Sequence, residues 1–261
     1  MVKSNKTQSI KKVSKKTTQK NLPKHKIPSG VQNHGKIWEN EILRKVYEIS
    51  PDSIPYTSIH DIPKERNKYT GYNVSIKATG TNKVDFGDAM RIYETAEKGS
   101  PLESIIIKYK QHGDIKKIDQ VLRLDLTNSK NKLFGNLPNV KERIQELSQM
   151  VKESNPKYKQ FAKNLQIDMK KSGAFLTVAP KIGNPEKKRY GRLQISLPNI
   201  TKYTDKYPES IIESTHCSIH GCSITNELIS GRRVPINKSS LHKLSGILES
   251  SIDDIEKSQL L

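Results

Sequence analysis

One stretch, residues 70–97 (TGYNVSIKATGTNKVDFGDAMRIYETAE), constrains the fold of this chain more than any other. Residues 72–78 alternate between apolar and polar side chains, which is typical of a strand with one buried face. Residues 88–97 then carry apolar side chains at helical spacing, and Gly99 and Pro101 end that pattern. The stretch therefore predicts a strand that bears Ser75 and Lys77 on one face, followed by a helix that opens with Asp88.

A lysine close to carboxylates suits phosphodiester hydrolysis. Carboxylate oxygens are the hard ligands that Mg²⁺ prefers, and a lysine can orient the attacking water or stabilise the developing negative charge. Acids occur near this lysine in the sequence, with Asp61 upstream and Asp85, Asp88 and Glu94 downstream.

These residues resemble the motif of the PD-(D/E)XK nuclease superfamily, which includes many type II restriction endonucleases. Asp61 takes the place of the upstream acid, and Ser75-Ile76-Lys77 takes the place of the acid-x-Lys strand. Ser75 departs from the usual Asp or Glu. Some members with Ser-x-Lys recover the missing carboxylate from the following helix. In this chain Asp85, Asp88 or Glu94 could supply it. Many members also carry an acid on the first helix, which Glu39 or Glu41 in HGKIWENEILRKVYEIS would match.

The resemblance covers about residues 35–126 and implies an α/β (α+β) fold with a restriction-endonuclease-like mixed sheet flanked by helices. It implies a type II restriction enzyme that cleaves double-stranded DNA with Mg²⁺ or Mn²⁺ and acts as a homodimer, from a prokaryote or a large DNA virus. The implied catalytic residues are Asp61, Ser75, Lys77, Asp88 and Glu41. Asp61 and Asp88 would hold the metal ion.

The charge of the chain favours a polyanionic partner. The sequence has 46 basic and 27 acidic residues and a net charge of +19. Residues 1–33 contain nine lysines and no acid, so both the tail and the remainder are basic. We expect a disordered basic tail over 1–33 and one nuclease-like domain over 34–261, with its catalytic core at 34–135 and a DNA-contacting part at 136–261. A lysine-rich surface that serves only solubility is the alternative.

Further patterns predict the elements around this core. Helical spacing covers residues 35–50, two runs within 138–171, and 239–251. Two β-branched runs joined by His112-Gly113-Asp114 predict a hairpin, and residues 175–180 and 190–197 read as two more strands. The second helix of 138–171 is rich in lysine, so it either follows a phosphate backbone or is a solvated face.

Two basic loops are the candidates for nucleic-acid recognition, because arginine pairs well with a guanine edge. The candidate side chains are those of Lys187, Lys188, Arg189, Arg192, Arg232 and Arg233. An exposed turn without a partner is the alternative for each loop.

The two cysteines, Cys217 and Cys222, fit a reducing compartment. They lie in THCSIHGC, where four potential zinc ligands are crowded into eight positions, so buried thiols and loop histidines are favoured and a zinc site stays open. No apolar run has the length of a membrane span. We therefore expect an intracellular protein, cytoplasmic, or nuclear or virion-associated if viral.

Two other functions compete with the nuclease. A non-catalytic basic protein that binds DNA or RNA would explain Ser75 as a decayed active site. A ribosome-associated or assembly factor would explain the tail, but the chain lacks an aromatic pattern for reading RNA.

Overall fold

The computed structural model describes residues 33–55, 60–183 and 191–229. Its main feature is a mixed five-stranded sheet in the order β1-β3-β4-β10, with β7 also paired to β4. Its strands are β1 (Asn73–Thr79), β3 (Leu102–His112), β4 (Ile115–Asp125), β7 (Ile211–Thr215) and β10 (Glu227–Ile229). β1 runs parallel to β3, and the other pairs are antiparallel. The expectation of a mixed sheet flanked by helices is confirmed.

A second sheet has the order β2-β6-β5 and is antiparallel throughout. It is built from β2 (Val84–Asp88), β5 (Thr177–Lys181) and β6 (Arg192–Leu197). A short hairpin forms from β8 (Ser218–Ile219) and β9 (Cys222–Ser223).

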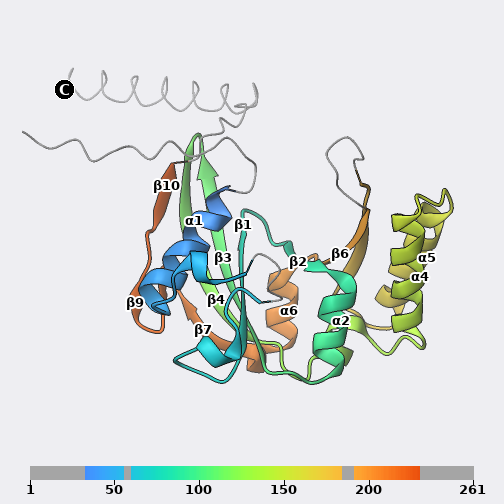
Figure 1. Ribbon diagram of the computed structural model, residues 1–261, viewed down its shortest axis with the longest axis horizontal. Helices are drawn as coiled ribbons and strands as arrows, with labels where there is room; N and C mark the ends of the chain where they lie inside the picture. Colours follow the sequence, from blue (N-terminus) through green and yellow to red (C-terminus); the bar gives the residue numbers. More distant parts are fainter. Residues whose placement is uncertain (1–32, 56–59, 184–190, 230–261) are drawn as a thin grey trace, which may run out of the picture.

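Helices cover both sheets: α1 (Asn33–Glu41), α2 (Ala89–Glu97), α3 (Lys130–Phe134), α4 (Val140–Lys152), α5 (Tyr158–Lys171) and α6 (Ile200–Lys206). Figure 1 shows α1 beside the five-stranded sheet and α2, α4 and α5 beside the second sheet. Among the described residues, no helix is long and apolar enough to cross a membrane.

The five-stranded sheet separates two apolar cores because its central strands are buried on both faces. On β3, Ile105 and Ile107 join α1, β1 and β8 in one core. Ile106 of the same strand joins α2, α4, α5 and the second sheet in the other core. Such continuous apolar runs are typical of strands with both faces covered.

Most sequence expectations for these elements are confirmed. The strand at 72–78 is β1, the helix after Asp88 is α2, and the hairpin of β3 and β4 turns at Gly113, whose φ is +59°. The two helical runs within 138–171 are α4 and α5, and β5 pairs with β6 as a hairpin. The tail 1–33, apart from Asn33, and the helix expected at 239–251 lie outside the described residues.

The helix expected at 35–50 is confirmed as far as Val46, but its last turn is not α-helical and residues 47–50 are not part of it. The α-helix ends at Glu41 and continues as a π-helical segment, Ile42–Val46. Ile42, Leu43, Val46 and Tyr47 are all buried in the core. Sequence reasoning also missed β2, α6, and the strands that follow residue 210.

Candidate functional site

The segment that carries Asp61 is held against the edge of the five-stranded sheet by β1. Ile62 and Val74 form an antiparallel bridge, with N–O distances of 3.1 and 2.8 Å. Ile62 is fully buried, so it anchors this loop in the core. The bridge places the carboxylate of Asp61 directly beside the Ser75–Lys77 stretch.

Asp61 uses one carboxylate oxygen to contact all three residues of that stretch. Its Oδ2 accepts hydrogen bonds from the Ile76 backbone N–H at 2.6 Å, from Lys77 Nζ at 3.1 Å and from Ser75 Oγ at 3.4 Å. The side chains of Asp61 and Lys77 are 25% and 23% exposed, so they are partly desolvated but still reachable by a ligand. The structure therefore brings together three of the expected site residues.

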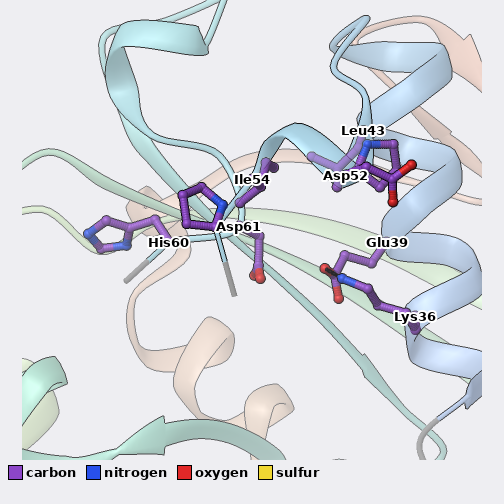
Figure 2. A pocket seen from close by; sticks show the side chains of 9 residues that line it. Lys36, Glu39, Leu43, Asp52, Ile54, His60 and Asp61 are labelled. Atoms are coloured by element: carbon purple, nitrogen blue, oxygen red, sulfur yellow. Dashed lines mark hydrogen bonds and ion pairs between the residues drawn. The ribbon is translucent and has the colours of Figure 1, made fainter. Parts of the chain in front are cut away.

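A second carboxylate, that of Glu39 on α1, faces the same space. Asp61 and Glu39 both line a pocket of about 420 Å³, together with Lys36, Leu43, Pro51, Asp52, Ile54, Pro55 and His60. Figure 2 shows Glu39 extending from α1 toward Asp61, while the imidazole of His60 points away from both. Burial raises the pKa of Glu39, and the negative charge of Asp61 raises it further, although Lys36 and Lys77 act in the opposite direction.

Glu41, the other candidate on the first helix, lies elsewhere. Its Oε1 accepts hydrogen bonds from the backbone N–H and Oγ1 of Thr225, at 2.9 and 2.8 Å, and pairs with Lys45 at 2.6 Å. Of the two glutamates that the sequence left open, the structure thus places Glu39 beside Asp61. The sequence could not separate them, because the partner of Glu41 comes from a segment that is 184 residues away.

Asp88 is used at the N-terminus of α2. Its side chain accepts a hydrogen bond from the Arg91 backbone N–H at 3.0 Å, as an N-cap residue does. Asp85 is half exposed and pairs with Lys83. Within 33–55, 60–183 and 191–229, no group of three or more His, Cys, Asp or Glu side chains could share a metal ion. The hydrogen bond of Asp88 is thus that of a helix cap, and the metal-binding role expected for Asp88 stays a prediction.

Sequence reasoning missed Arg91. In the described parts of the chain its buried Nε has no hydrogen-bond partner. The guanidinium lies close to Gly87, since a Cβ built there would be 3.1 Å from Arg91 Nη2. Burial lowers the pKa of His60, and the positive charge of Arg91 lowers it further. Arg91 thus adds a positive charge near His60, which lines the pocket. No pattern in the sequence around residue 91 indicated this.

The candidates for nucleic-acid recognition are described only in part. Lys187, Lys188, Arg189, Arg232 and Arg233 lie outside the described residues. Arg192 is exposed at the start of β6, directly opposite Lys181 of β5.

The THCSIHGC run forms the β8–β9 hairpin, and its two histidines have different neighbours. His216 Nδ1 lies 3.3 Å from the Asp119 carbonyl oxygen, whereas the His220 ring stacks on Tyr69 with 3.8 Å between centroids. Both cysteines are half-buried free thiols that pack against the core beside α1. The two histidines lie in a bend and a turn, as expected, whereas the thiols are half-buried and not fully buried as expected.

The carboxylate pair fits a divalent cation. Mg²⁺ is commonly bound by one or two carboxylates and keeps several of its waters. Only Oδ2 of Asp61 takes part in hydrogen bonds with the described residues. Burial, and then the negative charge of Asp61, raise the pKa of Glu39, and a bound cation would act against both effects. Comparisons of the chain with protein-family models, with curated proteins and with solved structures found no match.

Proposed function

We propose that this chain is an endonuclease that hydrolyses phosphodiester bonds of double-stranded DNA with Mg²⁺ or Mn²⁺, in the manner of a type II restriction enzyme. The observation that carries the proposal is the contact of Asp61 with the Ser75–Lys77 strand, at 3.1 Å from Lys77 Nζ, with Glu39 in the adjoining pocket. A basic chain of net charge +19 suits a polyanionic substrate.

Each residue has a distinct part in this proposal. Asp61 and Glu39 would hold the cation, which when bound lowers the pKa of a water molecule and offsets phosphate charge. Lys77, fixed by Asp61 and by the Ile76 carbonyl oxygen at 2.9 Å, would orient the attacking water and stabilise charge that develops on the phosphate. Ser75 and the Ile76 N–H would hold the Asp61 carboxylate in place. A homodimer on a palindromic site remains part of the proposal.

A non-catalytic DNA- or RNA-binding protein is the second candidate, and one observation favours it. Ser75 replaces the usual acid, and two of the three pocket carboxylates already pair with lysines, Asp61 with Lys77 and Glu39 with Lys36. Such a site would be the remnant of a catalytic centre.

The two glutamates of α1 provide a matched test of the proposal. Glu39→Gln removes a pocket carboxylate, whereas Glu41→Gln makes the same chemical change on the same helix at the Thr225 contact. We expect Glu39→Gln to lower the rate of DNA cleavage by about 100-fold or more, because a bound cation stabilises the transition state by several kcal/mol. Glu41→Gln should keep activity at temperatures where it remains folded. Equal activity of the two variants would contradict the placement of the metal site.

A further inference from the structure

Helix α5 carries three lysines in one line along its surface. At about 100° per residue, Lys163 and Lys170 fall within about 40° of Lys159 around the helix axis. All three are exposed. Over 11 residues this line is about 16 Å long.

Two other sides of α5 contact the rest of the protein, whereas Gln160, Asn164 and Ile167 are exposed. Ala162, Leu165 and Met169 are buried in the core, and Asp168 pairs with Arg143 of α4 at 2.8 Å. The only acid of α5 therefore points toward α4 and away from the three lysines. Gln166, beside the lysine line, donates a hydrogen bond to the Val178 carbonyl oxygen, so this side of α5 borders β5.

The positive surface continues onto the second sheet. Lys181 of β5 and Arg192 of β6 are directly opposite in the register, and both are exposed. Like charges at such positions repel each other. Because β5 runs back along α5, Lys181 lies toward the end of the helix that carries Lys159. We call these five residues, Lys159, Lys163, Lys170, Lys181 and Arg192, the lysine face. Figure 1 shows α5, which carries three of them, at the outer side of the second sheet, away from α1.

Many lysines of the described surface are paired with acids, whereas those of the lysine face are not. Elsewhere, ten lysines form ion pairs within 4.0 Å of a carboxylate: Lys36, Lys45, Lys68, Lys77, Lys83, Lys110, Lys117, Lys130, Lys132 and Lys141. In the described parts of the chain, no member of the lysine face forms such a pair. Lys98 and Lys202 on other elements also lack an ion pair with the described residues, so what distinguishes the lysine face is that five cations lie together while the only acid of α5, Asp168, pairs with Arg143.

We propose that the lysine face binds the phosphate backbone of duplex DNA outside the cleavage site. Each DNA strand presents a phosphate about every 3.4 Å along the axis, so a line of about 16 Å can follow several consecutive phosphates. Such contacts carry no sequence information and hold the duplex in register. The inference rests on DNA being the substrate, as proposed above, but not on catalysis.

The test measures binding instead of cleavage. Fluorescence anisotropy with a labelled DNA duplex in EDTA gives the affinity of the full chain between about 50 and 200 mM salt. The variant K163Q/K170Q removes two charges from the lysine face. The matched control, K98Q/K202Q, removes two exposed lysines that also lack an ion pair in the described chain but lie on other elements.

The slope of log affinity against log salt changes by about 0.9 for each phosphate that the protein no longer neutralises. We expect K163Q/K170Q to reduce the magnitude of the slope by up to about 1.8 and the control to leave it nearly unchanged. Equal reductions of the slope in the two variants, or no reduction in K163Q/K170Q, would contradict DNA binding by the lysine face but leave the proposed substrate unaffected. Failure of the wild-type chain to bind DNA, with binding only to RNA or to anionic vesicles, would overturn both this inference and the proposed substrate.

Discussion

Replacement of Glu103 by glutamine tests how the sheet beside the candidate site is held together. Glu103 is fully buried on β3, directly opposite Val74 of β1. Its carboxylate accepts two hydrogen bonds from Arg123 of β4, Nε–Oε1 at 2.6 Å and Nη2–Oε2 at 3.1 Å. Arg123 is only 7% exposed, so Glu103→Gln leaves a guanidinium that is largely buried without its main counter-charge.

Loss of one partner from a buried ion pair costs about 3–5 kcal/mol. For a chain of this size, each kcal/mol lowers the melting temperature by about 2–4 °C, so we expect a decrease of about 6–20 °C. Urea unfolding followed by circular dichroism measures the change in free energy, and thermal unfolding gives the melting temperature.

Glu213→Gln provides the matched control, because Glu213 contacts the same arginine. Its Oε2 accepts one hydrogen bond from Arg123 Nη1 at 2.9 Å, but its side chain is 23% exposed. We expect a cost of about 1 kcal/mol. Equal losses in the two variants, or a loss below about 1 kcal/mol for Glu103→Gln, would refute the reasoning that burial makes this pair critical.

Three further predictions concern stability. Because the folded state raises the pKa of Glu39, ionised Glu39 destabilises the fold once the pH rises above the ordinary pKa of 4.5. Glu39→Gln should therefore raise the melting temperature at pH 7 without metal and abolish stabilisation by Mg²⁺. A lower melting temperature of the variant would contradict this. Burial, and then the charge of Arg123, lower the pKa of His220 to about 4. The fold should therefore lose stability as the pH falls from 6.5 toward 4, and thermal melts of His220→Asn should show a smaller loss over that range. Gly135 has φ +71°, and an added Cβ would lie 2.7 Å from the Ser172 carbonyl oxygen. Gly135→Ala should therefore lower the free energy of unfolding, measured in urea, by about 1–3 kcal/mol. An unchanged urea midpoint would show that the turn adapts.

Local sequence patterns predicted most of the elements near the site because each depends on short-range periodicity. Alternation specified β1, and the capping position of Asp88 together with helical spacing specified α2. The β3–β4 hairpin followed from two apolar runs and a glycine with a positive φ.

The site itself depends on contacts between distant segments, which a sequence pattern does not contain. The bridge of Ile62 to Val74 brings Asp61 to Lys77, and the motif resemblance anticipated this proximity. The choice of Glu39 over Glu41 depends instead on where Thr225 packs. Likewise, Asp88 had the spacing of a metal ligand, but its carboxylate serves the first turn of α2.

The most direct test of the proposed nuclease is to incubate supercoiled and phage DNA with the wild-type chain and with Lys77→Ala, in Mg²⁺ and in EDTA. The proposal predicts discrete fragments that form only in Mg²⁺ with the wild-type chain, and their ends would define the target sequence. DNA that stays intact in Mg²⁺ and Mn²⁺ but is retarded in a gel would contradict the proposal and identify the chain as a nucleic-acid-binding protein.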